Sequence, residues 1–207
     1  MNRMNKMNFY KFLRRFYYFL YKVSDKVRGV DFSALESSMI DSAHGVHYTP
    51  SVSKGVKIIL RKLNITENDS IIDIGCGKGK AISLFSKFPF SKNDGVEISD
   101  ELVKIATKNN LKLKIDNSDI FCANAIEFEK YADYNYFYIF NSLPPELFEK
   151  VFLKINNSNT GTIKYIITLN PIYRTIILKN DHFILLHTYK SFFKGFDVDC
   201  YTSRQLI

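Results

Sequence analysis

The residues best suited to chemistry lie in one short stretch, residues 71–80. An apolar run carries a single acid, Asp73, and three glycines follow at alternate positions, Gly75, Gly77 and Gly79. Glycine lets the backbone turn sharply and approach a ligand closely. A helix begins after the turn, and the N-terminus of a helix offers free N–H groups to an anionic group. A strand, a glycine turn and a helix in this order are typical of a site for a nucleotide-like ligand.

The glycine spacing separates this turn from two other nucleotide motifs. The dinucleotide fingerprint is G-x-G-x-x-G, whereas Lys80 occupies the place of its third glycine here. The stretch also lacks the G-x-x-x-x-G-K-[ST] pattern of a Walker loop. An NAD-linked oxidoreductase is therefore disfavoured. Lys78 and Lys80 are expected to project outward and are assigned no role.

Further polar residues follow the apolar runs that come next in the chain. Glu97 ends the second run, about 20 residues beyond the glycine turn, as expected of a ribose partner. Its two carboxylate oxygens suit the two hydroxyl donors of a ribose. Asn124 and Ala125 follow a third run, and Asn141 follows a fourth that is aromatic and almost uncharged.

Alternating strands and helices must position these residues. The expected strands are residues 71–74, 93–98, 120–122, 136–140 and 163–169, with helical spacing between them. Two more strands, 182–189 and 196–201, form a closing hairpin with a turn near Gly195. Before the first strand, Thr49 can cap a helix that has Pro50 at its first position. The pattern predicts an α/β fold.

The N-terminal region reads as an extension of this domain. Residues 9–27 form an amphipathic helix with basic residues opposite its apolar face. The apolar face consists of Phe9, Phe12, Leu13, Phe16, Leu20, Val23 and Val27. We expect it to pack on the domain as a cap; the alternative is docking on an anionic membrane or a partner. Residues 31–45 look irregular and are expected to lie flexibly over the site, so that residues 1–46 are the extension and 47–207 the domain.

Composition narrows the class of protein further. The chain has 207 residues and a net charge of +8, which suits an acidic partner, although a lysine-rich surface is the favoured explanation. Its three cysteines form no C-x-x-C pair, which favours a reducing, cytoplasmic setting. We expect no membrane span and no ordinary signal peptide. His44 and His47 have no acid or cysteine nearby to complete a metal site.

The motif D-x-G-x-G-x-G, the second acid and the order of elements over residues 47–203 resemble class I S-adenosylmethionine (SAM) dependent methyltransferases. Bacterial uncharacterised members and the non-SET lysine methyltransferases are the most similar. The resemblance implies a Rossmann-like seven-stranded sheet flanked by helices. Its expected strand order is 3-2-1-4-5-7-6, with the last strand antiparallel. It also implies that SAM is the cofactor.

The resemblance assigns roles along the site. Asp73 would orient the glycine turn and approach the amino-acid end of SAM, and Glu97 would bind the ribose hydroxyls. Ile98 would pack on the adenine, and Asn124, beside Ala125, stands where the family often has an aspartate that contacts the adenine amino group. Tyr48 and Thr49 resemble a segment that closes over the methionine part of SAM; an ordinary helix start explains them equally well.

The loop after the fourth strand, residues 141–145, would hold the methyl acceptor. DNA amino-methyltransferases have [DNS]-P-P-[YFW] here, but two residues separate Asn141 from Pro144 and Glu146 replaces the aromatic residue. A nucleic-acid base is therefore disfavoured as the acceptor. Asn141 could instead accept a hydrogen bond from an amine of a protein lysine or a small molecule, with Tyr48, Tyr138 and Phe140 as nearby aromatic surface. The alternatives are a base methyltransferase and a SAM-binding module that has lost catalysis.

Overall fold

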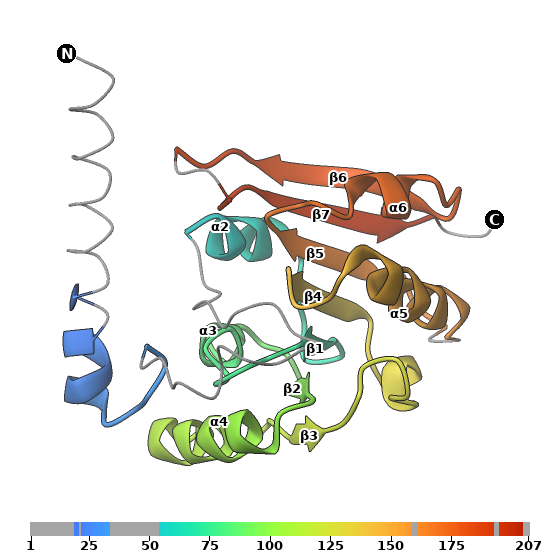
Figure 1. Cartoon of the computed structure of the whole chain (residues 1–207). Helices are drawn as coiled ribbons and strands as arrows, with labels where there is room; N and C mark the ends of the chain where they lie inside the picture. The colour runs from blue at the N-terminus through green and yellow to red at the C-terminus, as the bar shows by residue number, and fades with distance from the viewer. Residues whose placement is uncertain (1–18, 21, 34–53, 159–160, 193–194, 205–207) are drawn as a thin grey trace.

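A seven-stranded sheet forms the centre of the molecule (Figure 1). The structure is a computed structural model that describes residues 19–20, 22–33, 54–158, 161–192 and 195–204. The strands are β1 (Ser70–Ile74), β2 (Lys92–Glu97), β3 (Ile120–Cys122), β4 (Tyr136–Phe140), β5 (Tyr165–Leu169), β6 (Phe183–Tyr189) and β7 (Val198–Ser203). Their order in the sheet is β3-β2-β1-β4-β5-β7-β6, as the resemblance predicts.

The direction of the strands also matches the prediction. Strands β1 to β5 pair in parallel, while β7 pairs antiparallel with both β5 and β6. The carboxyl ends of the parallel strands therefore lie at one edge of the sheet. This is the edge at which ligands bind in open α/β sheets, and the glycine turn and Asn141 both follow strands that end there.

Helices cover both faces of the sheet. They are α2 (Lys54–Lys62), α3 (Ile82–Phe85), α4 (Asp100–Leu113), α5 (Pro145–Asn157) and α6 (Arg174–Leu178), with the short 3₁₀ helix η2 (Lys130–Asp133). Alternate residues of a strand face opposite sides, so β4 contributes to two cores. Phe137 and Ile139 pack with α5, whereas Tyr136 and Tyr138 pack with α2 and α3. This double burial explains why the β4 sequence is apolar or aromatic throughout.

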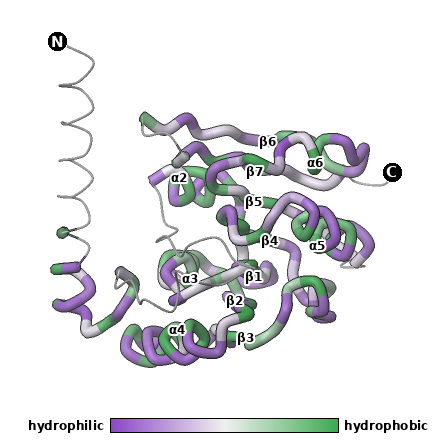
Figure 2. The backbone as a smooth tube through the Cα atoms, viewed as in Figure 1, coloured by the Kyte–Doolittle hydropathy of each residue, from purple (hydrophilic) through white to green (hydrophobic). Residues whose placement is uncertain are grey.

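Helix α4 shows how local sequence sets the position of the site. The Ser99 hydroxyl caps its N-terminus by accepting a hydrogen bond from Leu102 N. Asp100 and Glu101 follow in the first turn, where negative charge is favourable. Hydrophobic and hydrophilic residues alternate along α4 and α5 (Figure 2), so each helix has one face for the sheet and another for solvent. The chain therefore leaves β2 directly after Glu97 and begins a helix at Asp100.

The N-terminal helix comprises residues 19–20 and 22–28 in the structure. Its apolar side chains are exposed: Phe19 60%, Leu20 47%, Val23 44% and Val27 82%. The predicted packing of the apolar face on the domain is thus not found for Leu20, Val23 and Val27, the residues of that face that the structure describes. The reason is that the helix turns Asp25, which is buried, toward the domain instead. The rest of the predicted helix, and residues 34–53 with Tyr48 and Thr49, lie outside the described residues.

In the part of the chain that the structure describes, every helix is too short or too polar to cross a bilayer.

Candidate functional site

The glycine turn brings β1 against two neighbouring segments. Gly75, Gly77 and Gly79 have φ angles of 75°, 53° and 78°, a region that glycine adopts without strain. The amides of Gly75 and Cys76 both donate to Val96 O of β2, at 2.8 and 3.1 Å. A Cβ atom on Gly75 would lie 2.3 Å from Cβ of Ser142. Glycine at position 75 therefore allows the turn and the loop after β4 to touch.

Two buried carboxylates lie beneath this turn. Glu97 accepts hydrogen bonds from Gly77 N and Ser99 N, each at 3.0 Å, so one oxygen binds the turn and the other the start of α4. Asp73 is 2% exposed, and its Oδ2 has no hydrogen-bond partner among the described residues. Burial, and then the negative charge of Glu97, raise the pKa of Asp73 well above its usual value. The pair suits a ligand that brings positive charge together with hydroxyl donors.

Asn141 joins this group from the next strand. It follows β4 with a φ of 44°, and its buried Oδ1 has no hydrogen-bond partner in the described part of the chain. The hydroxyl of Ser142 donates to Ile74 O at 2.7 Å, which ties the loop after β4 to the end of β1. The structure thus brings Asp73, the glycine turn, Glu97 and Asn141 to one edge of the sheet, as the sequence predicts.

The predicted adenine contacts lie beside Glu97. Ile98 is 65% exposed and follows Glu97 directly. Ala123 N donates to Glu97 O at 2.9 Å, which holds the segment after β3 close to the end of β2. In that segment Asn124 Oδ1 accepts from Ile126 N at 3.0 Å, and Ala125 is buried. Asn124 therefore organises a local turn with its carbonyl oxygen, which can still accept a second hydrogen bond.

Two other residues near the site, Tyr138 and Cys76, are buried and serve as packing residues. Tyr138 is completely buried and packs edge-on against Phe85, with ring centroids 5.2 Å apart, so it offers no surface to an acceptor. Burial, and then the charges of Asp73 and Glu97, raise the pKa of the Cys76 thiol. Cys76 is therefore a protonated packing residue and not a nucleophile. Among the described residues no cluster of His, Cys, Asp or Glu could hold a metal ion.

The prediction that the two lysines of the turn project outward is wrong. Lys78 is fully buried and Lys80 is 7% exposed, so neither projects outward. Lys78 Nζ lies 2.8 Å from Oδ2 of Asp31, a residue of the N-terminal region. Sequence reasoning missed this ion pair because a lysine in a polar turn is usually solvated. The only hint in the sequence was that Lys78 and Lys80 alternate with the glycines of the turn.

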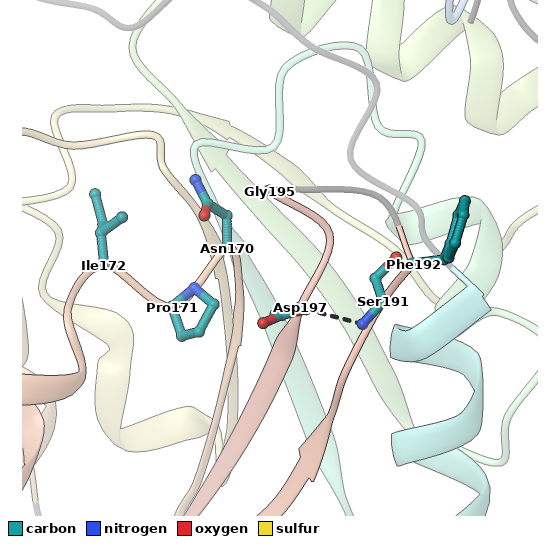
Figure 3. A pocket seen from close by; sticks show the side chains of 7 residues that line it. All are labelled: Asn170, Pro171, Ile172, Ser191, Phe192, Gly195 and Asp197. Atoms are coloured by element: carbon teal, nitrogen blue, oxygen red, sulfur yellow. Dashed lines mark hydrogen bonds between the residues drawn. The ribbon is translucent and has the colours of Figure 1, made fainter. Parts of the chain in front are cut away.

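A pocket of about 450 Å³ lies further along the same edge (Figure 3). It is lined by Asn170, Pro171, Ile172, Ser191, Phe192, Gly195 and Asp197. Leu169 pairs with Phe140 on one side and with Val198 on the other. Asn170, which follows Leu169, is thus one strand away from Asn141, and its amide donates to Asp197 O at 2.8 Å. The sequence did not predict this pocket, because only the register of β7 brings its two sides together.

Comparison with known proteins places this site in a family. A family model described as methyltransferase small domain matches residues 37–145, a little over half of the chain. A protein-lysine N-methyltransferase of Saccharolobus islandicus is 37% identical over 65 residues, which cover 31% of this chain and 40% of that protein. A probable cobalt-precorrin-6B C(15)-methyltransferase of Methanococcus maripaludis is 30% identical over 108 residues, or 51% of this chain and 56% of that protein. The chain thus spans about half the length of these relatives.

The fold is also similar to solved structures. An RNA methyltransferase from Salinibacter ruber, in complex with S-adenosyl-L-homocysteine, superposes with a TM-score of 0.58. It is 18% identical in sequence, and the match covers 77% of this chain and 96% of that chain. At this identity the similarity concerns the arrangement of strands and helices and not the substrate.

Proposed function

Because the chain belongs to the methyltransferase small domain family, we propose that it transfers a methyl group from SAM to an acceptor amine. The observation that carries the proposal is the pair of buried acids, Asp73 and Glu97, beneath a glycine turn. A buried carboxylate with an unpartnered oxygen requires a cation or a donor for compensation. SAM carries a sulfonium, an ammonium and two ribose hydroxyls, so its chemistry fits this pair.

The residues present suit each part of SAM. Glu97 is held by two backbone amides and keeps lone pairs for the ribose hydroxyls. Asp73 offers its free oxygen to the ammonium end, directly or through water. Ile98 provides exposed apolar surface for the adenine, and Asn124 a polar edge. Tyr48 and Thr49 remain proposed contacts of the methionine part.

The chain has little acid–base work to do in this reaction. When bound, SAM supplies a methyl group that its sulfonium has already activated. The protein must align the nucleophile with that methyl group and exclude water. The buried carboxylates favour a cationic ligand, and the contact between Ser142 and Ile74 O fixes the acceptor loop beside the turn.

We propose an amine as the acceptor, with a protein lysine as the leading case. Asn141 Oδ1 is buried at the end of β4, where it can accept a hydrogen bond from an N–H group. Tyr173 OH donates to Leu143 O at 2.6 Å and steadies the loop that carries Asn141. The similarity to a protein-lysine N-methyltransferase supports this choice. Glu146, in place of an aromatic residue, argues against a flipped base, and the pocket beside Asn170 can receive the part of the acceptor beyond the amine.

Calorimetry with SAM, S-adenosylhomocysteine and NAD tests the cofactor proposal. Wild-type protein should bind the first two, and Glu97→Ala should weaken SAM binding by about 1–3 kcal/mol, the scale of a lost hydrogen bond to a charged group. Glu129→Ala is the matched control, because that acid is exposed and pairs only with Lys154 among the described residues. Absence of SAM binding by wild type, or tighter binding of NAD, would contradict the proposal.

The acceptor class needs a separate experiment. Labelled SAM is incubated with the protein and fractions of native lysate. The label should appear on protein, as a methyl group bound to an amine nitrogen. Label on nucleic acid or on an oxygen atom would show that the acceptor proposal is wrong while leaving methyl transfer in place. SAM binding without any transfer of label would indicate a SAM-binding module.

A further inference from the structure

The N-terminal region reaches the glycine turn through a segment that we call the N-terminal strap, residues 25–33. Its residue Asp31 forms the ion pair with Lys78, at 2.8 Å between Oδ2 and Nζ. The Lys78 side chain has no exposure, whereas the Asp31 side chain is 39% exposed. The strap therefore supplies the negative charge that a buried ammonium in the turn requires.

A single amide group fastens the strap and the turn to α4. Asn109 Oδ1 accepts from Asp31 N at 2.9 Å, and Asn109 Nδ2 donates to Asp31 O and to Lys78 O, both at 2.9 Å. Asn109 is 2% exposed, so these bonds are shielded from water. Backbone atoms of the strap and of the turn are thus held by the same side chain.

The charge of a second acid in the strap, Asp25, acts on the second lysine of the turn, Lys80. Burial lowers the pKa of Lys80 to about 8, and the negative charge of Asp25 acts in the opposite direction. Asp25 is itself buried and accepts from Phe32 N at 3.1 Å, which closes the strap on itself. Phe32 is 1% exposed and anchors the end of the strap.

We propose that Asp31 and Lys78 are positioning residues for the cofactor, so that SAM affinity depends on the seating of the strap. The turn leads directly from Lys78 to Gly77, whose amide donates to Glu97 Oε2. If the strap leaves, the buried Lys78 ammonium loses its ion pair with Asp31, and the turn must change to compensate the charge. Such a change displaces the amide that orients Glu97. The inference rests on the proposed function, because Glu97 is its ribose partner.

The same coupling must act in the other direction. If the seated strap strengthens SAM binding, then bound SAM stabilises the seated strap by the same factor. A purely structural ion pair would change the stability of the protein without this reciprocal effect. Hydrogen exchange at the strap amides therefore distinguishes a positioning role from a structural one.

The test measures SAM affinity by calorimetry for Asp31→Asn, Lys78→Met and Asp31→Glu. We expect the first two variants to weaken SAM binding by about fivefold or more, the lower end of usual coupling between sites. Asp31→Glu keeps the negative charge and should weaken binding less than Asp31→Asn. The matched control is Lys104→Met, which breaks an exposed lysine–aspartate pair on α4 and should leave the affinity unchanged. If Lys78→Met does not fold, Asp31→Asn carries the test, because the Asp31 side chain is 39% exposed whereas that of Lys78 has no exposure.

Hydrogen exchange of the full chain with and without S-adenosylhomocysteine completes the experiment. The ligand should slow exchange at the amides of Asp31 and Phe32 in wild type, and the effect should shrink in Asp31→Asn. This inference is overturned if wild type and the variants bind SAM with equal affinity and the ligand does not change exchange at the strap. The proposed function would then still stand. Wild type that binds no SAM overturns both.

Discussion

At the end of β1, Asp73 is a carboxyl group that the free protein accommodates at a cost. Its pKa is raised by burial and by the charge of Glu97, so between the unfolded and the folded pKa the folded protein holds a proton that the unfolded chain has released. This stabilises the fold below the ordinary aspartate pKa of about 3.9, and the contribution is lost as the pH rises through the raised pKa. A cationic ligand relieves the same cost by favouring the ionised form.

Replacing Asp73 should therefore separate stability from ligand binding. Without SAM at neutral pH, Asp73→Asn should raise the free energy of unfolding by about 1 kcal/mol, a usual size for single substitutions. This gain in the free energy of unfolding should shrink as the pH falls toward 4. At neutral pH the variant should bind SAM more weakly than wild type, because it lacks the carboxylate. Urea unfolding at several pH values measures the first effect, and calorimetry the second. A variant that is less stable than wild type at neutral pH would contradict this account.

Asn141 combines an unpartnered amide oxygen with a left-handed backbone. Asn141→Ala should lower turnover about tenfold, as expected for one lost hydrogen bond, with a smaller effect on SAM affinity. The alanine also strains the backbone by roughly 1–2 kcal/mol, because only glycine and a few polar residues adopt this region readily.

The control is Asn141→Gly, which removes the amide and relieves the strain. Both variants should lose turnover, whereas only the alanine variant should lose stability in thermal unfolding. Steady-state kinetics with the identified acceptor supplies the turnover. Full activity in the glycine variant would show that the Asn141 amide has no role in holding the acceptor.

At the scale of elements, the N-terminal helix presents its apolar residues to solvent while the strap holds its end. Phe19, Leu20, Val23 and Val27 are exposed, and Lys22, Lys26 and Arg28 lie among them in the sequence. This combination suits the surface of a membrane with anionic lipids. We propose that the protein is cytoplasmic and associates peripherally with such a membrane through this helix.

The corresponding prediction concerns vesicle binding. The full chain should sediment with vesicles that contain phosphatidylglycerol and much less with neutral phosphatidylcholine vesicles. Val23→Asp combined with Val27→Asp should reduce the bound fraction several-fold, because it places charge on the apolar face. Leu153→Asp is the control, since Leu153 is also about half exposed but lies on α5. Equal binding by the double variant and wild type would refute the membrane role.

For the whole molecule, local signals in the sequence predicted the strands and the site residues, and the family resemblance predicted the strand order. Asp73, the glycines and Glu97 stand at fixed spacings, and the uncharged run of β4 indicates burial on both faces. Contacts between distant segments carry no such signal. Asp31 and Lys78 are 47 positions apart, and nothing in either segment shows that they meet. The amphipathic pattern of residues 9–27 likewise identifies an apolar face without identifying its partner.

The contact between Gly75 and Ser142 has a consequence for redesign. A methyl group on Gly75 would collide with Ser142, and the Ser142 hydroxyl also binds Ile74 O. A larger residue at position 142 would push the turn that follows β1. A loop transplanted from another enzyme to change the acceptor would then alter cofactor affinity as well, unless it kept a small hydroxyl residue there. Acceptor choice is better engineered at Leu143 or along residues 170–172, where side chains can change without moving the glycine turn.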